Sequence, residues 1–537
     1  MFRRSIQASM IAQLVLYSYP LVVLFLFQRL PRHEALIWSV LMGYLFLPTH
    51  TGIDLPLLPE LNKTLIPSLT AGLMCLMLPD AGNAKSGRRH RTKSEKDSPP
   101  EPLPQQSSLI ANTCLIVLFL VPVGVFWTNQ EALVFGPRRI GGIRPYDIFS
   151  MMLSVGVTLL PFLLARRYLT TPAARVALLR ALVVGGLIYS VLILIEVRLS
   201  PQLNKWIYGF YPHSFQQHIR AGGFRPMVFL EHGLRVGIFI AMTCLAAVAL
   251  WRMKTTTDDV TAPTPPESSN SGHRPRPAKP RPYLLYAGYL FIILFLSKTF
   301  GAFLIAFALL PVAVFLGTRL QLIAAACIAA AVLTYPTLRA SEIFPMERLT
   351  ESLISLNAER ASSFIFRVEH EETLLEKARQ KPGFGWGGWG RARIYDPETG
   401  RDLSVTDGVW VIVFGEKGWL GYLATFGLLT LPMIALALRR RNVGMVGSGL
   451  CLLLVANLVD MLPNSALTPI TWLVAGTVLA LYENPARASA PDNPMRRAAP
   501  DPVKPRARAG PIRTAATPRH PPAPRGASTR KRRTGSF

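Results

Sequence analysis

Apolar residues in this chain of 537 residues come in long runs that shorter polar segments separate. The runs lack the spacing of three and four residues that gives a soluble helix a single apolar face. A helix needs about 20 apolar residues to cross the hydrocarbon core of a bilayer. The pattern therefore predicts an all-α, polytopic integral membrane protein with about 12–13 transmembrane helices and one large external loop. The predicted spans are 10–30, 35–47, 64–78, 109–127, 148–165, 176–197, 227–251, 283–297, 301–316, 320–335, 419–438, 443–459 and 467–481.

Polar segments divide these spans into groups. Two of the segments and the carboxyl-terminal tail are basic and rich in Pro and Ser, so they bury too little apolar surface to fold. The expected organisation is transmembrane helices in 1–79, a disordered basic linker in 80–107, central transmembrane helices in 108–252, a disordered Pro-rich linker in 253–282, transmembrane helices in 283–335, a large loop in 336–406, transmembrane helices in 407–482 and a disordered basic tail in 483–537.

Basic residues concentrate on alternate loops, as the positive-inside rule describes. Alternate threading puts four basic segments on the cytoplasmic side, namely 86–96, 166–180, 252–281 and 439–441. It puts a first external segment (128–147), a second external segment (198–226) and the large loop on the other side. This threading places the amino terminus outside, whereas Arg3 and Arg4 favour the inside. We expect a multi-pass membrane protein whose large loop lies on the side opposite the cytoplasm.

The formal net charge of +27 would favour nucleic acid as a partner if the protein were soluble. Here the charge follows the loops and the tail, so we expect the lipid bilayer, and no nucleic acid, as a partner. The cysteines are expected to be small core residues, because all five lie inside apolar runs without C-x-x-C spacing. The sequence indicates no metal and no cofactor.

The large loop is the only long polar segment between spans whose composition favours folding. Residues 364–379 have an amphipathic helical pattern, and the run GFGWGGWG follows at 383–390. This run lacks the GxGxxG spacing and the preceding strand of a dinucleotide site. It predicts a tight turn that returns the chain to the membrane, with Trp386 and Trp389 at the interface. Alternatively, Trp386 binds substrate by stacking on a sugar.

External segments should be poor in arginine, yet this chain places several there. Arginine is always charged and can bind two phosphate oxygens at once. Outside the cytoplasm no nucleotide is normally available, and a donor activated by a lipid pyrophosphate would need such fixed cations. The candidate phosphate-binding residues are Arg144, Arg220, Arg225, Arg360 and Arg367. Pairing with loop acids or lipid headgroups is the alternative.

Charged residues also interrupt the predicted seventh span near its outer end. Glu231 and Arg235 are four residues apart and can pair on one helical face, with His232 beside them. Alternatively, this cluster lines a site for a lipid-borne sugar. Lys298 follows the eighth span, where it either extends to the membrane surface or contacts phosphate.

Asp407 lies where the large loop returns to the membrane. Partial burial would raise the pKa of its carboxyl group and a neighbouring arginine would orient it, as a general base requires. The alternative is a structural role, in which Asp407 caps a helix that begins at Val409.

Several of these residues stand in an order that resembles the O-antigen ligase and Wzy-type polymerase superfamily. The pair DG at 407–408, nine residues and then GWLG at 418–421 are similar to the family pattern His-(Asn/Ser/Gln)-x9-Gly-x-x-Gly. Arg367, a helix and the run KPGFGWG at 381–387 look like the family's arginine, helix and P-x-x-G-x-G turn. The tripeptide SKT at 297–299 is similar to a short motif of exopolysaccharide polymerases in that superfamily.

The resemblance covers about residues 220–429. It implies a metal-independent glycosyltransferase that uses undecaprenyl-pyrophosphate-linked oligosaccharide, in a bacterial inner membrane with its active site facing the periplasm. Arg225 and Arg367 would hold the pyrophosphate, and Asp407 would take the place of the family's histidine as base, with Glu231 or His232 as rivals. Because ligases usually carry histidine there, the aspartate favours a polymerase of exopolysaccharide or O-antigen. The alternatives are an O-antigen ligase acting on lipid A core or protein and, from another class, a transporter or lipid-linked sugar flippase. Chain-length regulators and export proteins are further candidate partners.

Overall fold

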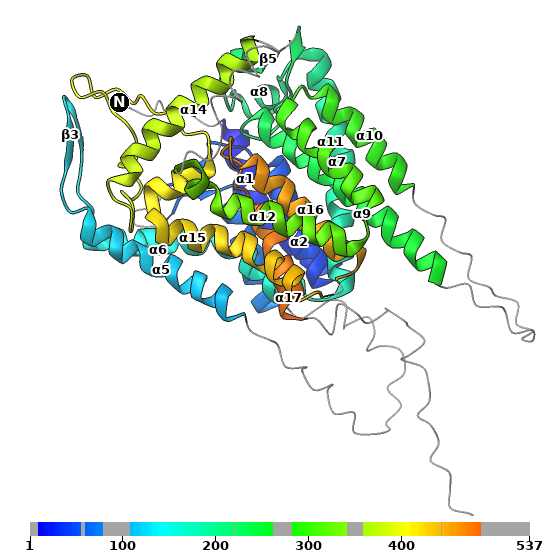
Figure 1. The fold of residues 1–537 in the computed structure, drawn as a ribbon. Coiled ribbons are helices and arrows are strands. Elements are labelled where there is room, and N and C mark those ends of the chain that lie inside the picture. The colour runs from blue at the N-terminus through cyan, green and yellow to red at the C-terminus, as the bar shows by residue number, and fades with distance from the viewer. Residues whose placement is uncertain are drawn as a thin grey trace, which may run out of the picture. The chain divides into compact units, whose positions relative to one another are not determined.

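The computed structural model describes residues 9–54, 59–78, 108–220, 222–260, 282–340, 358–441 and 443–484. Helices dominate this part of the chain, and the only strands among the described residues form three short two-stranded hairpins (Figure 1). Each of the predicted spans overlaps one helix. These helices are α1 (Met10–Arg29), α2 (Arg32–Phe46), α3 (Leu65–Met77), α5 (Leu109–Thr128), α6 (Pro145–Tyr168), α7 (Pro172–Leu199), α9 (Gly233–Val260), α10 (Tyr283–Leu296), α11 (Phe300–Phe315), α12 (Thr318–Ala340), α15 (Val409–Leu438), α16 (Gly444–Asp460) and α17 (Pro469–Glu483).

Length and composition confirm an all-α, polytopic membrane protein. Within the described residues, seven helices are long and apolar enough to cross a membrane, namely α1, α5, α6, α7, α9, α12 and α15. Shorter apolar helices are α3, α10, α11, α16 and α17. Two predicted helix starts were wrong, because α9 begins at Gly233 rather than at 227 and α15 begins at Val409 rather than at 419. The helix α12 also extends to Ala340, beyond the predicted end at 335. The predicted Pro-rich linker also begins with helix, since α9 continues to Val260.

Short elements fill the segments between the spans. They are β1 (Gly52–Ile53), β2 (Leu61–Asn62), β3 (Leu133–Phe135), β4 (Arg138–Ile140), α8 (Leu203–Tyr208), the 3-10 helix η1 (Phe215–His218), β5 (Ile219–Arg220), β6 (Gly223–Phe224) and α14 (Ala358–Arg379). The strands pair antiparallel as β1 with β2, β3 with β4, and β5 with β6. The predicted amphipathic helix of the large loop is confirmed by α14, which is longer than expected.

The predicted external segments lie at one common end of the helices, and Figure 1 shows α8, α14 and β5 there. The Tyr208 hydroxyl of the second external segment donates to the Phe46 carbonyl at the end of α2, at 2.6 Å. Asn129, at the end of α5, donates through its side-chain amide to the Gly385 carbonyl of the large loop at 2.9 Å. The start of α1 lies at this end too, because a Cβ on Gly209 would stand 3.3 Å from the Cβ of Ser9. Alternate threading therefore holds through the first three helices.

Basic residues that follow two of the spans meet at the opposite end of the helices. Arg166, at the end of α6, forms a two-pronged ion pair with Glu483 at the end of α17, at 2.6 and 2.9 Å. The backbone N–H of Ser108 donates to the same carboxylate at 3.0 Å. Arg441 donates to the Tyr482 carbonyl at 2.9 Å. The basic ends of α6 and α15 therefore lie at the end of the helices opposite the large loop, as the charge pattern predicts.

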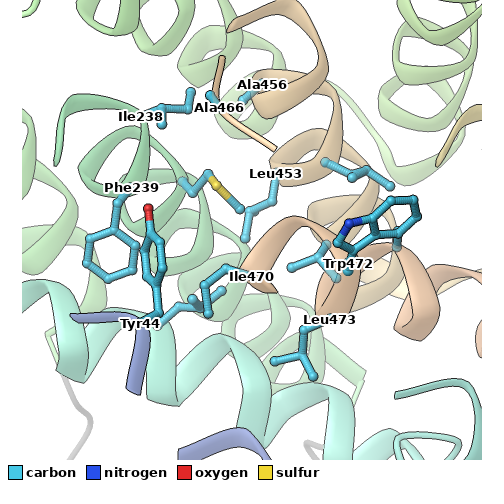
Figure 2. Packing of buried hydrophobic residues seen from close by; sticks show 14 of the residues in the cluster. Tyr44, Ile238, Phe239, Leu453, Ala456, Ala466, Ile470, Trp472 and Leu473 are labelled. Carbon is cyan, nitrogen blue, oxygen red and sulfur yellow. The ribbon is translucent and has the colours of Figure 1, made fainter. Parts of the chain in front are cut away.

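The centre of the core lies where α2, α9, α16 and α17 meet (Figure 2). In α9 89% of the most apolar window is buried within the protein, against 28% in α1 and α6, so α9 is central and those two helices are peripheral. The residues labelled in Figure 2 are all buried: Tyr44, Ile238, Phe239, Leu453, Ala456, Ala466, Ile470, Trp472 and Leu473. The candidate site described below is built on the start of this central helix.

Candidate functional site

Glu196, in the last turn of α7, anchors both ends of the second external segment. Its side chain is 1% exposed, and its Oε1 accepts a hydrogen bond from the N–H of Leu203 at 3.0 Å. Its Oε2 accepts from the N–H groups of Met227 and Val228 at 2.8 and 2.7 Å. Val228 has a φ of +52°, a strained value for a β-branched residue. One buried carboxylate therefore holds the two ends of the segment at a single point.

His213 and His218 of this segment and His232, just before α9, pack ring against ring. The His213 and His232 centroids are 4.7 Å apart, those of His218 and His232 are 5.1 Å apart, and those of His213 and His218 are 5.9 Å apart. His218 Nδ1 lies 2.9 Å from the Ser214 carbonyl, so this nitrogen carries the proton and Nε2 the lone pair. The N–H of Leu234 donates to His232 Nδ1 at 3.1 Å, which leaves the His232 proton on Nε2.

Two of these rings are neutral at pH 7. Burial and, to a smaller extent, the positive charge of Arg225 together lower the pKa of His218 to about 4. Burial also lowers the pKa of His232 to about 3, and the neighbouring His218, His213 and Arg225 act in the same direction. For neither of these two rings does the negative charge of a carboxylate offset the effect of burial on the pKa.

His213 differs from the other two rings because two carboxylates face it. Burial lowers its pKa below the usual value, whereas the negative charges of Glu231 and Asp407 raise it. Asp407 lies just before α15, whose N-cap is Gly408. The expectation that Asp407 caps this helix was therefore wrong. The fold instead brings Asp407 into electrostatic contact with a ring of the second external segment.

The start of α9 carries the arginines of the site. A Cβ on Gly233 would stand 2.4 Å from Cδ of Arg225, so the Arg225 side chain lies directly on this glycine. Arg235 Nη1 pairs with Glu231 Oε2 at 2.7 Å, which confirms the predicted ion pair. Glu231 and His232 precede the helix, however, because α9 begins at Gly233. Both acidic and basic groups are thus held at the start of α9.

Lys298 and Arg220 join this site from two sides. Lys298 follows α10, and its Nζ donates to the Arg220 carbonyl in β5 at 3.1 Å. A Cβ on Gly223 would stand 2.3 Å from that Nζ, so the ammonium group covers the β5–β6 hairpin. Lys298 therefore contacts protein rather than only extending to the membrane surface. Its φ of +54° lies in the left-handed region and marks a tight turn between α10 and α11.

The glycine turn of the large loop packs directly against a kink in α15. Gly418 interrupts this helix with φ of 62° and ψ of −167°, a conformation that glycine favours. The N–H of Trp419 donates to the Pro382 carbonyl at 2.7 Å, and the N–H of Trp386 donates to the Gly415 carbonyl at 2.8 Å. The predicted tight turn is confirmed. The two glycine motifs that carry the resemblance touch through their backbones.

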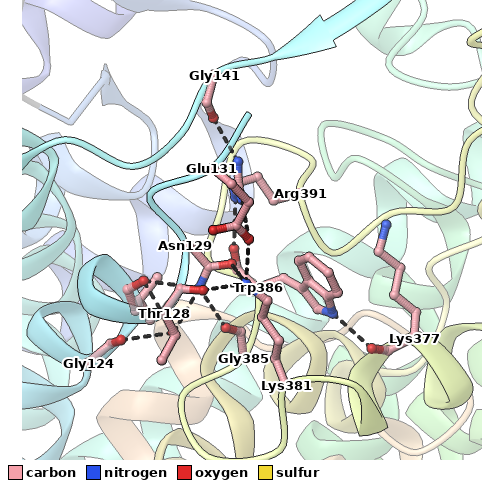
Figure 3. A network of polar contacts seen from close by, with 11 residues as sticks. Gly124, Thr128, Asn129, Glu131, Gly141, Lys377, Lys381, Gly385, Trp386 and Arg391 are labelled. Atoms are coloured by element: carbon pink, nitrogen blue, oxygen red, sulfur yellow. Dashed lines mark hydrogen bonds and ion pairs between the residues drawn. The ribbon is translucent and has the colours of Figure 1, made fainter. Parts of the chain in front are cut away.

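A polar network ties this turn to the first external segment (Figure 3). Lys381 Nζ donates to Glu131 Oε1 at 2.6 Å and to Asn129 Oδ1 at 3.1 Å. Arg391 is fully buried and donates through Nη1 to the Gly141 carbonyl at 2.7 Å. These bonds give the large loop a fixed position over the ends of α5 and α6.

The side chain of Trp386 is packed into this network and is not exposed on the protein surface. Its side chain is 8% exposed, and Nε1 donates to the Lys377 carbonyl at 2.8 Å. The ammonium groups of Lys381 and Lys377 lie 4.5 and 5.1 Å from the ring centroid. The buried ring offers little area to a sugar or to the membrane interface. The exposed tryptophan of the turn is Trp389, at 57%.

The helix of the large loop docks on α12 and α15 through Glu371. Arg339 Nε lies 3.5 Å from Glu371 Oε1, and Trp410 Nε1 donates to Glu371 Oε2 at 3.3 Å. Burial raises the pKa of the Glu371 carboxyl, while the positive charge of Arg339 opposes that shift. Arg360 and Arg367 belong to the same helix, and their side chains lie outside the described part of the structure.

Arg144 lies away from the cluster that the other predicted residues form. It is exposed at the start of α6, where its backbone N–H donates to Asp147 Oδ2 at 2.7 Å. Figure 1 shows the neighbouring β3 on a different side of the bundle from β5. The structure thus brings Arg220, Arg225, Glu231, His232, Lys298 and Asp407 to one region, whereas Arg144 and Trp386 belong to another.

Sequence reasoning missed four residues of this region. Glu196, His213 and His218 are described above. Lys63 lies beside the Glu231–Arg235 pair and donates to the Phe229 carbonyl at 3.0 Å, and burial lowers its pKa to about 7. A compositional signal was present, because three of the nine histidines fall within 213–232. Nothing in the sequence singles out Lys63 or Glu196.

The described residues contain no group of three or more His, Cys, Asp and Glu side chains that could hold a metal ion. The histidine rings therefore pack together without forming a ligand set. A small, partly open hollow lies at the opposite end of the helices, near the Arg166–Glu483 pair. It is lined by Ser108, Ile110, Ala111, Gly427, Leu431, Pro432, Ala435 and Tyr482.

The fold and this polar end define the chain as a multi-pass, all-α membrane protein with a charged cluster at the ends of its central helices. No model of a known protein family matches the chain, and no curated protein matches it.

Proposed function

We propose that this protein is a membrane glycosyltransferase that joins undecaprenyl-pyrophosphate-linked oligosaccharide repeat units into exopolysaccharide or O-antigen. It would work in a bacterial inner membrane with the polar end of its helices facing the periplasm. A hydroxyl of one repeat unit would attack the anomeric carbon of the chain held on the lipid carrier. The pyrophosphate would leave with the electron pair of the broken bond.

One observation carries this proposal. Arg225 and His213 belong to the second external segment, Asp407 lies far from them in the sequence just before α15, and all three gather near the start of the central helix α9. A lipid-linked donor needs such a place, because its carrier stays in the bilayer while its sugars are in water. Fixed cations at that depth stabilise the charge that develops on the departing pyrophosphate.

The contact between the glycine turn and the kink at Gly418 also supports the proposal. The motifs that resemble the polymerase and ligase superfamily are close in space as well as ordered in sequence. A ligase would use the same chemistry with lipid A core or protein as the acceptor. A transporter would be expected to place charges near the middle of the membrane, whereas this cluster lies at the helix ends.

Arg225→Ala in the only chromosomal copy tests the proposal. Lipid-linked saccharides are extracted from these cells and sized by mass spectrometry, after equal membrane levels of the protein have been verified. The matched control is Arg139→Ala, which removes an exposed arginine of the β3–β4 hairpin. We expect single repeat units to accumulate on the lipid in the Arg225 variant and long polymer to be lost. The control should resemble wild type.

Other outcomes separate the alternatives. Long chains that accumulate on the lipid, with none transferred, would identify a ligase. Lipid-linked units that stay on the cytoplasmic face and cannot be labelled from outside would identify a flippase. An unchanged saccharide profile after deletion of the whole protein would refute any role in glycan assembly.

A further inference from the structure

We propose that His213 is the group that takes the proton from the attacking sugar hydroxyl, and that Asp407 stabilises the imidazolium that results. This inference rests on the glycosyl transfer proposed above and assigns its base. It changes the role of Asp407 from proton acceptor to positioning residue. The histidine comes from the second external segment, which sequence comparison with the polymerase pattern does not reach.

The charges around the three histidines distinguish His213 from the others. A base that becomes positive is stabilised by negative charge nearby. Burial lowers the pKa of His213, and among the three rings only His213 has two carboxylates, Glu231 and Asp407, that oppose this shift. His218 and His232 instead face Arg225, which disfavours their protonation. These two rings are suited to remain neutral, and they can form a polar wall beside the reacting groups.

The geometry of His213 fits a base that is held in place. Its Nδ1 is buried and has no hydrogen-bond partner among the described residues. The ring meets His232 edge to face at 4.7 Å and 90°, which fixes its plane. The preceding carbonyl, of Pro212, lies 3.0 Å from His50 Nε2, and His50 also faces the ring as a titratable neighbour. The residue is nevertheless partly exposed, so substrate can approach it.

Imidazole is also the better base for this step. Near neutral pH it combines a large neutral fraction with a much higher proton affinity than a carboxylate has. In the proposed step the O–H bond of the acceptor breaks and its proton passes to His213. The oxygen forms a bond to the anomeric carbon, and the bond from that carbon to the phosphate oxygen breaks. The electron pair leaves with the lipid pyrophosphate beside Arg225, and His213 later returns its proton to water.

The test uses the full-length protein in liposomes with lipid-linked saccharides extracted from cells that lack it. Initial rates of chain extension are measured from pH 5 to 9 for wild type, His213→Ala, Asp407→Asn, Arg225→Ala and the control His33→Asn. His33 lies near the start of α2, at the opposite end of the helices. General-base catalysis contributes about 100-fold to 10,000-fold, so His213→Ala should lose at least about 100-fold and the fall of rate at low pH should disappear.

Asp407→Asn gives a second readout that does not depend on the histidine variant folding. Removal of a negative charge lowers the pKa of His213, so the low-pH limb of the rate profile should move to lower pH and the plateau should fall. The control should keep both the rate and the profile.

Different experimental results would refute the assignment of the base and the proposed glycosyl transfer. If Arg225→Ala is inactive while His213→Ala keeps the wild-type rate and profile, the assignment of the base is overturned and the glycosyl transfer stands. An Asp407→Asn profile that coincides with wild type would overturn the role of Asp407. If the wild-type protein itself extends no chain in liposomes and its deletion leaves cellular glycans unchanged, both proposals fall together.

Discussion

Glu196→Gln probes how the second external segment is held, because it changes one buried atom and keeps the volume of the side chain. The carboxylate accepts three backbone hydrogen bonds, from Leu203, Met227 and Val228. Glutamine has only one acceptor oxygen, and its amide group donates. In the more favourable orientation of the glutamine amide, its oxygen still accepts from the N–H groups of Met227 and Val228. Its NH₂ group then faces the N–H of Leu203, and because both groups are donors that hydrogen bond is lost.

The expected loss follows from these three bonds. A hydrogen bond to a charged group contributes about 1.5–3 kcal/mol net, and a neutral one about 0.5–1.5 kcal/mol. One charged bond is lost, and each of the two that remain weakens by about 1 kcal/mol. The sum is about 3.5–5 kcal/mol. Since 1.4 kcal/mol corresponds to a factor of ten, local opening of the segment should become more frequent by about 300-fold or more.

Hydrogen exchange followed by mass spectrometry measures this change directly. Peptides that cover 200–232 are compared between wild type and the variant at pH 7 in the same lipid nanodiscs. Glu398→Gln, at an exposed position of the large loop, is the control and should exchange like wild type. If exchange in 200–232 stays within about threefold of wild type, by the same energy scale, the carboxylate does not anchor the segment. Other contacts would then hold the second external segment in place.

Three further predictions concern the kink in α15, the buried Arg391 and the histidine rings. Gly418→Ala would place a Cβ 2.4 Å from the large-loop backbone, and alanine would be strained in the backbone conformation of Gly418. The free energy of unfolding should therefore fall by about 3 kcal/mol or more, as measured by thermal melts. Gly288→Ala, where nothing lies within 4 Å, should leave it unchanged or raise it by up to about 1 kcal/mol. Arg391→Met removes hydrogen bonds to two backbone carbonyls and should make the glycine turn sensitive to limited proteolysis, with each unsatisfied carbonyl costing about 1–3 kcal/mol. In the folded protein the pKa values of His218 and His232 are lowered to about 4 and 3. Below pH 6.5 the unfolded segment therefore binds more protons than the folded one. Stability should therefore decrease as pH falls from 6.5 towards 4, by about 1.4 kcal/mol per pH unit for each ring, and His218→Asn should reduce that slope in hydrogen exchange at pH 5 and 7.5.

The sequence by itself determined the membrane class, the order of the spans and the end of the bundle to which each loop belongs. These properties depend on hydropathy summed over about 20 neighbouring residues and on the count of basic residues between spans, so they can be calculated without knowing any contact. The glycine turn at 383–390 was also predictable, because Gly385, Gly387 and Gly390 all have positive φ and local sequence sets such backbone conformations.

Only the tertiary structure decided which polar residues form the site. The charge of Asp407, just before α15, acts on His213 of the second external segment, and no local pattern connects residues so far apart in the sequence. Packing also buried Trp386, which the sequence suggested as a sugar contact, and left Arg144 apart from the other cations. The physical reason is that hydropathy fixes how deep a residue lies in the membrane, whereas the neighbours of a side chain depend on how the helices pack laterally, through many contacts between segments distant in sequence.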